Sequence, residues 1–214
     1  MGMQGRLTLK IISLAIGGWL LVGCASEDLQ TLPPYEGYGS VTQDPEQYTY
    51  LIGPGDNLNV FVWRNPEVST GVTVRPDGKI TTPLVEDLQA SGKTAAELAR
   101  EIEEVLEIYI RQPIVTVIVG GFVGPYSEQI RVVGEATTPQ ALPFREDMSL
   151  LDVMIRVGGL TEFAAGNQAS IVRMVDGEQQ QYRVRIDDLL RGGDITANVS
   201  MLPGDILIIP ESWF

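Results

Sequence analysis

The first predicted strand is marked by alternating hydrophobic and polar positions. In LNVFVW (58–63), every second residue from the leucine onward is aliphatic, a period of two that is typical of a strand with one buried face. The two aromatic residues between them fall on the opposite face, and the tryptophan is nevertheless expected to belong to the core. The first face consists of Leu58, Val60 and Val62, and the second of Phe61 and Trp63.

Two further segments predict strands in the same half of the chain. The stretch GVTVRPDGKITTPL (71–84) has two β-rich arms around Pro-Asp-Gly, which is typical of a hairpin. The stretch IVTVIVGGF (114–122) is rich in β-branched residues and predicts a mostly buried strand.

A helical period lies between these strands. Thr94 and Glu97 in TAAE have the spacing of a capping box, in which each side chain accepts a hydrogen bond from the backbone of the other residue. Apolar residues then recur three and four positions apart and predict one buried helix face, and Gln112-Pro113 ends the segment. The first module is therefore expected to be β-β-β-α-β. Its helical stripe consists of Leu98, Ile102, Val105, Leu106 and Tyr109.

The second half of the chain predicts a mixed sheet with one short apolar helix. The stretch QIRVVGEATTPQALPF (129–144) predicts two strands, and SIVRMVDGEQQQYRVRI (170–186) predicts a hairpin with Asp-Gly at its turn. Ser149 and Asp152 form a second capping-box pattern before a helix that Gly158-Gly159 ends. A short helical turn and a closing strand complete a β-grasp-like domain. These last two elements cover 187–194 and 202–211.

Pro-Gly-Asp occurs at the start of the first module and before the last strand of the second. Proline presets φ near −65° and glycine permits positive φ, as the central positions of a type II turn require. The aspartate can then accept a backbone N–H as the chain enters a strand. Because the two turns occupy different places in their modules, they are not copies of one repeat. The turns are Pro54-Gly55-Asp56 and Pro203-Gly204-Asp205.

The amino-terminal residues have the pattern of a secretory signal peptide. Arg6 and Lys10 precede an apolar run of about a dozen residues, which is shorter than the ~20 that a membrane-spanning helix needs. The run ends in LVGC (21–24), which resembles the bacterial lipobox. That resemblance implies cleavage after residue 23 and diacylation of Cys24, and a buried free cysteine is the alternative.

The residues that follow the cysteine indicate a tether. Two or three acyl chains would anchor the chain durably to a membrane. Ala25 and Ser26, where aspartate is absent, favour sorting to the outer membrane in Gram-negative lipoproteins. Residues 24–47 are rich in Pro, Gly, Ser and Thr, so we expect them to form an acylated, flexible tether. The alternative is a segment that becomes ordered against a neighbour through Tyr35, Tyr38 and Tyr48.

Composition excludes most catalytic chemistry. The chain has 15 basic and 28 acidic residues, a net charge of −13, no histidine and one cysteine. Nucleic acid is therefore not an expected partner, and there is no His general base, His/Cys zinc site or disulfide. No cofactor or metal is predicted. Paired carboxylates suffice for glycoside hydrolysis, but each candidate pair has an ordinary structural explanation. The pairs are Glu101 with Glu104, Asp187 with Asp188, and Asp56 with Asp205.

Aromatic and basic residues provide further candidate contacts. Tyr126, Trp213 and Phe214 are candidates for stacking on sugar rings or packing against another subunit, and packing is favoured. Arginines gather in the second module, where they line a solvated sheet face or bind an acidic polymer. They are Arg131, Arg145, Arg156, Arg173, Arg183 and Arg185.

The ordered segments resemble a known family. YLIGPGDNLNVFVW, VTVRPDGKITTPL and PIVTVIV resemble the polysaccharide export domain of bacterial outer-membrane polysaccharide export lipoproteins. IRVVGEA, SLLDVMIRVGGLT and MLPGDILIIPE resemble the soluble-ligand-binding β-grasp domain that follows it in those proteins. The branch beside exosortase-linked exopolysaccharide clusters is the most similar. The expected fold is thus α+β, with a polysaccharide export domain at 48–122 and a β-grasp domain at 127–212.

The resemblance implies a structural role in transport without bond chemistry. Such proteins form homo-oligomeric rings in the periplasm that pass exopolysaccharide outward, and an inner-membrane copolymerase docks onto them. The best-known members also carry a second β-grasp copy and an amphipathic pore helix, and this sequence shows neither. We therefore expect a separate outer-membrane β-barrel to provide the opening. The alternatives are a saccharide-binding regulatory module and a periplasmic glycan-active enzyme.

Overall fold

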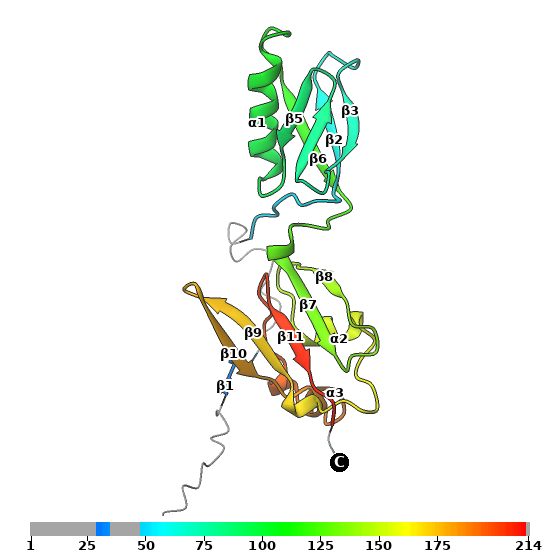
Figure 1. The fold of residues 1–214 in the computed structure, drawn as a ribbon, viewed down its shortest axis with the longest axis vertical. Coiled ribbons are helices and arrows are strands. Elements are labelled where there is room, and N and C mark those ends of the chain that lie inside the picture. Colours follow the sequence, from blue (N-terminus) through cyan, green and yellow to red (C-terminus); the bar gives the residue numbers. More distant parts are fainter. Residues whose placement is uncertain (1–28, 35–47, 213–214) are drawn as a thin grey trace, which may run out of the picture.

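The computed structural model describes residues 29–34 and 48–212. These residues form two domains placed end to end, joined by the segment 121–129, which we call the junction segment (Figure 1). Helices and strands are mixed in both domains, so the α+β expectation is confirmed. Residues 1–28 and 213–214, with the proposed signal peptide, Cys24, Trp213 and Phe214, lie outside the described residues.

The first domain packs one helix against antiparallel strands. Its three-stranded sheet has the order β3-β2-β6, and β4 and β5 form a separate two-stranded sheet. The aliphatic face of β2 and the buried face of α1 share one hydrophobic core. In chain order the elements are β2 (Asn57–Val62), β3 (Thr70–Thr73), β4 (Lys79–Thr82), β5 (Val85–Gln89), α1 (Ala95–Leu106) and β6 (Val115–Gly120).

The start of α1 is as the sequence predicts. The Thr94 hydroxyl accepts from the Glu97 N–H at 3.2 Å, and the Glu97 carboxylate accepts from the Thr94 N–H at 2.8 Å. These two bonds satisfy backbone donors that the first turn of a helix otherwise leaves unpaired. The helix ends at Leu106, so Tyr109 does not continue the buried stripe and is 60% exposed.

Three details of the first domain differ from the sequence predictions. The arms of the expected 71–84 hairpin pair with different strands: β3 with β2, and β4 with β5. A tight turn at Leu84, where φ is +65°, gives β4 a partner close in sequence, which costs little loop entropy. The strand β5 was not predicted, because only Val85 of its five residues is buried. The strand β6 is buried on one face only, and Ile118 on the other face is 56% exposed.

The second domain is a six-stranded mixed sheet. Its order is β1-β10-β9-β11-β7-β8, with β11 parallel to β7 and antiparallel to β9. The helix α2 packs into the core of this sheet through Leu150, Val153 and Met154. Both the Ser149/Asp152 capping box and the β9–β10 hairpin are confirmed. The hairpin turns at Asp176-Gly177, where both φ angles are positive, as a tight two-residue turn requires.

The second domain contains short helical turns as well as strands. Its strands are β1 (Gln30–Thr31), β7 (Gln129–Gly134), β8 (Ala141–Pro143), β9 (Ser170–Val175), β10 (Glu178–Arg183) and β11 (Ile206–Ile209). Its helices are α2 (Leu150–Arg156) and α3 (Ile186–Leu190), with 3-10 turns at Gly166–Gln168 and Ile195–Ala197 and one in the junction segment at Tyr126–Glu128.

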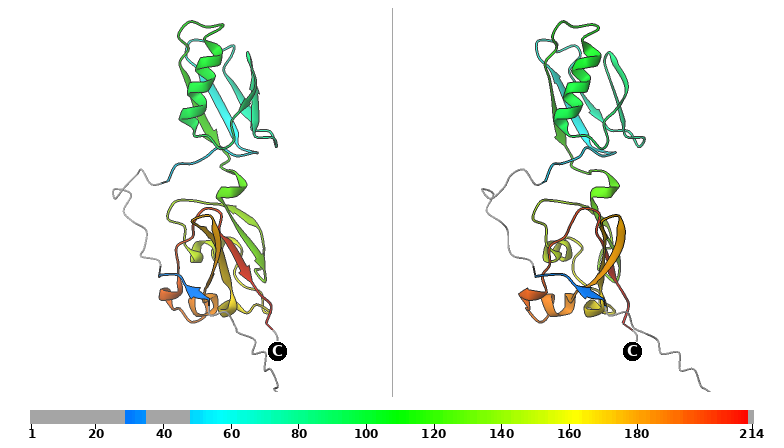
Figure 2. Two further views of the ribbon diagram at one scale, coloured as in Figure 1. Left: turned by 60° about the vertical axis from the view of Figure 1, so that its left-hand side comes forward. Right: turned by 90° about the vertical axis from the view of Figure 1, so that its left-hand side faces the viewer.

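Part of the expected tether belongs to this sheet. Gln30 and Thr31 pair in parallel with Tyr182 and Arg183, so β1 extends the sheet beyond β10 (Figure 2). Pro34 forms a further bridge with Val199. An edge strand such as β10 offers unpaired N–H and C=O groups, which explains why the polar residues of β1 pair there, and Leu32 next to them packs against the core of the domain. The flexible-tether prediction is therefore wrong for residues 29–34.

Candidate functional site

The first Pro-Gly-Asp turn ties its own domain to the junction segment. Gly55 has φ of +92°, and the Asp56 N–H donates to the Gly53 carbonyl at 3.2 Å, which closes the turn. Asp56 is fully buried. Its Oδ2 accepts from the Gly53 N–H at 2.8 Å and the Tyr50 hydroxyl at 2.6 Å, and its Oδ1 from the N–H groups of Val123 at 2.6 Å and Gly124 at 3.3 Å. One carboxylate thus links the chain that leads into the first domain to the chain that leaves it.

The second turn is built in the same way and contacts the same segment. Asp205 is fully buried, and its Oδ2 accepts from the Leu202 N–H at 2.8 Å. Arg173 on β9 donates to both carboxylate oxygens, from Nε at 2.9 Å and from Nη2 at 2.7 Å. A methyl group at Gly204 would lie 2.7 Å from the Ser127 carbonyl oxygen. The first Pro-Gly-Asp turn therefore holds the junction segment by hydrogen bonds, and the second lies against the same segment at Ser127.

Most of the carboxylates considered for catalysis are held by structural partners, and Glu104 is exposed on α1. Asp56 and Asp205 belong to different domains. Glu101 forms an ion pair with Lys93. Asp187 pairs with Arg191 at 3.1 Å, and Asp188 pairs with Arg185 at 2.7 Å. Among residues 29–34 and 48–212, no group of acidic or cysteine side chains gathers to hold a metal ion.

The arginines of the second module do not form one surface. Arg173 is largely buried in its pair with Asp205, and Arg185 bonds Asp188 and Asp194. The others, Arg131, Arg145, Arg156 and Arg183, are exposed on different elements. The prediction of a solvated sheet face thus fits only part of the set.

A pocket lies at the junction between the domains, beside the first turn. It has a volume of about 480 Å³ and is lined by residues of both domains. Tyr48 packs edge-on against Phe144, with ring centroids 5.1 Å apart, and Tyr50 packs edge-on against Phe122 at 5.5 Å. Burial raises the pKa of both tyrosines; the Asp56 hydrogen bond adds to this effect at Tyr50, and the negative charges of Glu128 and Glu146 add to it at Tyr48. The remaining lining residues are Gly121, Pro143, Arg145 and Glu146.

Phe122 is held in an unusual backbone conformation in this pocket. Its φ is +44°, in the left-handed region that bulky residues rarely adopt and that costs of order 1–3 kcal/mol. Its side chain is also 56% exposed. The Asp56 bonds to the next two backbone N–H groups fix the chain here. An exposed aromatic ring in a strained conformation makes Phe122 a candidate functional position.

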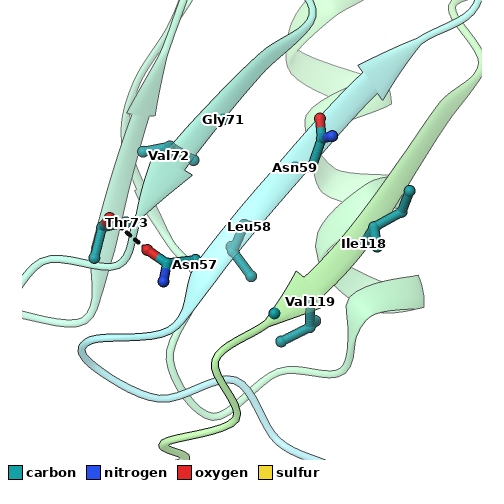
Figure 3. A pocket seen from close by; sticks show the side chains of 9 residues that line it. Asn57, Leu58, Asn59, Gly71, Val72, Thr73, Ile118 and Val119 are labelled. Carbon is teal, nitrogen blue, oxygen red and sulfur yellow. Dashed lines mark hydrogen bonds between the residues drawn. The ribbon is translucent and has the colours of Figure 1, made fainter.

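The outer face of the β3-β2-β6 sheet is a second candidate surface. Figure 3 shows a groove of about 410 Å³ over these strands. The Asn57 amide oxygen accepts from the Thr73 hydroxyl at 2.8 Å, and Asn59 lies between Gly71 and Ile118 in the register. Because Gly71 has no side chain, the face is hollow there.

Further along β2 the same face becomes aromatic. Phe61 and Trp63 are 44% and 53% exposed, with ring centroids 6.4 Å apart, and Ile114 beside Trp63 is 58% exposed. The prediction that Trp63 belongs to the core is wrong. The residue falls on the face opposite Val62, and α1 covers only the Val62 side.

Tyr126, a predicted candidate for sugar or subunit contacts, lies in the 3-10 turn of the junction segment, and its side chain is 74% exposed. Phe122 and Phe144 were not named as candidates in the sequence analysis. A phenylalanine within GGFVG (120–124) at a domain boundary is the signal that could have pointed to this site, since such a ring has no helix or strand face to bury it.

Comparison with known proteins identifies both domains. Residues 44–120 match the polysaccharide biosynthesis/export protein family, and residues 128–209 match the SLBB domain. The first domain thus matches the polysaccharide export family and the second domain matches the SLBB domain. Within residues 29–34 and 48–212, no helix has the length and apolar character needed to cross a bilayer.

The relatives include proteins named for polysaccharide export. The chain is 26% identical over 186 residues to the EPS I polysaccharide export outer membrane protein EpsA of Ralstonia nicotianae, and 27% identical over 182 residues to that of Ralstonia solanacearum. These matches cover 76% and 74% of this chain and 47% of each relative, so the chain spans about half the length of these curated relatives. It is also 32% identical over 124 residues, 52% of this chain and 28% of the relative, to the exopolysaccharide production protein ExoF of Rhizobium meliloti.

Proposed function

We propose that this protein is a component of an exopolysaccharide export machine at the outer membrane, and that it acts by assembly and shape rather than by catalysis. The observation that carries the proposal is the ordered pair of domains, an export domain followed by an SLBB domain, shared with relatives named for exopolysaccharide export. The structural use of the candidate carboxylates supports a role without bond chemistry. The partners that the family resemblance implies are the inner-membrane copolymerase and an outer-membrane β-barrel.

The proposed membrane anchor is the acylated Cys24, with the protein facing the periplasm. The cysteine precedes Gln30 of β1 by six residues, a stretch that spans at most about 20 Å when fully extended. Because β1 is paired with β10, the second domain would lie next to the membrane. The first domain extends away from the second domain (Figure 1), and would therefore point toward the periplasm.

Deleting the gene in its host tests the proposal. We expect secreted polysaccharide to be lost and polymer to accumulate in the periplasm, and the wild-type gene to restore secretion. A Cys24→Ser variant should take up no labelled palmitate, should leave the outer-membrane fraction and should restore secretion poorly. Normal secretion by the deletion strain would contradict the proposed function, and palmitate on the Cys24→Ser protein would contradict the anchor alone.

The outer face of the β3-β2-β6 sheet is the surface that we assign to self-association. A net charge of −13 makes copies of this chain repel one another, so contact is favoured where negative charge is absent. The patch of Phe61, Trp63, Ile114 and Ile118 is apolar and 44–58% exposed, and the one charged group over it is the Arg64 guanidinium, 5.9 Å from the centre of the Trp63 ring. Aromatic residues are enriched in the buried centres of protein interfaces.

Replacing Trp63 with serine should therefore shift the protein from large homo-oligomers toward monomers. The reason is that a large exposed aromatic at the centre of an interface contributes much of its binding energy. Mass photometry in mild detergent measures the shift. Ile155→Ser on α2, whose side chain is 69% exposed, is the matched control and should leave the oligomer intact. An unchanged oligomer in the Trp63 variant would show that this face is not the interface.

A further inference from the structure

The junction pocket has the lining of a site for a small ligand. Its volume of about 480 Å³ falls within the range of roughly 300–1,000 Å³ found for such sites, and domain junctions are a preferred location for them. Four of its residues are aromatic: Tyr48, Tyr50, Phe122 and Phe144. They come from three separate stretches of the chain, so the pocket exists only when both domains are folded and docked.

The polar groups of the pocket limit the charge of the ligand. Arg145 and Glu146 are one cation and one anion, so the lining as a whole carries no net charge. The buried Asp56 carboxylate lies directly behind the lining, 2.6 Å from the Tyr50 hydroxyl, so two carboxylates face the single arginine at this place. A ligand bearing carboxylates would therefore be repelled, whereas hydroxyl groups can both donate to Glu146 and accept from Arg145.

A sugar ring combines the two properties that this lining selects. Its C–H faces are apolar and pack on aromatic rings, and its hydroxyl groups point outward from the rim toward hydrogen-bonding partners. Phe122 offers such a ring, since it makes a single T-shaped contact with Tyr50 and 56% of its surface is exposed. The positive φ of Phe122 is maintained because the N–H groups of the next two residues donate to Asp56. These hydrogen bonds keep the ring in the junction pocket.

We propose that the junction pocket binds an uncharged pyranose unit of a glycan, with Phe122 and Tyr48 as the stacking platform and Arg145 and Glu146 as partners for its hydroxyl groups. This inference rests on the proposed export function and specifies a contact between the protein and its cargo. Because both domains contribute to the site, occupancy favours the docked arrangement of the domains over any other.

A titration of the full chain with defined sugars tests the proposal. The probes are neutral pentasaccharides of glucose and of mannose, neutral fragments of the host's own secreted polymer, and a pentagalacturonate as the acidic comparison. Ligand-observed NMR, in a detergent without a sugar headgroup, follows binding up to about 10 mM. We expect at least one neutral probe to bind and the galacturonate to bind more weakly.

Variants of the aromatic platform make the test specific. Glycine adopts the positive φ of residue 122 without strain, so Phe122→Gly removes the ring and keeps the fold. We expect it to weaken binding of the neutral probe at least about tenfold, and Tyr48→Ala to weaken it similarly. Tyr126→Ala is the matched control, since this exposed aromatic belongs to the same segment but does not line the pocket, and it should bind as the wild type does.

Other outcomes overturn the assignment. These are the absence of binding by every neutral probe, preferred binding of the galacturonate, binding that both platform variants retain, and an equal loss in Tyr126→Ala. The failure of this inference is distinguishable from that of the proposed function. If gene deletion traps polymer while the titration fails, only the pocket assignment is wrong, and if the deletion strain secretes normally, the export function itself is wrong.

Discussion

Replacing Asp56 with alanine is expected to lower the free energy of unfolding by at least about 3 kcal/mol. The carboxylate accepts four hydrogen bonds, three of them from backbone N–H groups, and its side chain is fully buried. Alanine would leave the buried N–H groups of Gly53 and Gly124 without partners, and each such loss costs about 1–3 kcal/mol. The Tyr50 and Val123 donors are only partly buried and add less. Urea denaturation followed by circular dichroism measures the change.

The variant should also loosen the junction between the domains. Val123 and Gly124 are held by Asp56 across 67 and 68 residues of sequence, so their amide protons should exchange faster with solvent in the variant. Asp77→Ala is the control. Asp77 is exposed and pairs with exposed Arg75, so its loss should change stability by less than about 0.5 kcal/mol. If the Asp56→Ala protein were as stable as this control, Asp56 would not be holding the junction segment in place.

Replacing Arg173 with methionine is expected to destabilise the second domain by about 3–5 kcal/mol. The guanidinium donates to both oxygens of Asp205, whose side chain is 0% exposed, and also to the Ser200 carbonyl at 2.9 Å. Removing the cation leaves a buried negative charge without compensation, which is the costly way to break such a pair. Thermal and urea denaturation both report the loss.

A double-mutant cycle separates the pair from its surroundings. Arg173→Met combined with Asp205→Asn should cost less than the sum of the two single changes, with a coupling energy of about 2 kcal/mol or more. Arg131→Met on β7 is the matched control, because its side chain is exposed in the same sheet, and it should stay within about 0.5 kcal/mol of the wild type. If the two single changes in the free energy of unfolding were additive, Arg173 would not stabilise Asp205 and would be available for another partner.

The sequence predicted those features that depend on neighbours along the chain. The alternation at Leu58, Val60 and Val62 gave the buried face of β2, and the Thr94 and Ser149 capping boxes gave the starts of both longer helices. In each case the physical cause lies within a few residues: the pleat of a strand, or a hydroxyl within reach of a backbone N–H.

The features that the sequence analysis missed depend on partners that are distant in the sequence. Nothing near Asp56 in the sequence indicates that its carboxylate reaches Val123, and nothing in Gln30-Thr31 indicates the edge of β10. Trp63 was misplaced for the same reason, because burial of that face depends on whether α1 covers it. The junction pocket combines residues around positions 48–50, 121–122 and 143–146, and only the folded chain brings them together.

The pairing of β1 with β10 decides where mechanical load would enter the protein. If the chain is held at its amino-terminal end, tension passes first into β1 and from there into the six-stranded sheet through the ladder with β10 and the bridge at Pro34. The first domain, from Asn57 of β2 to Gly120 of β6, shares no sheet with β1 and lies outside the direct path of that tension. A pull on the amino-terminal end would thus load the sheet of the second domain before it reached the first domain.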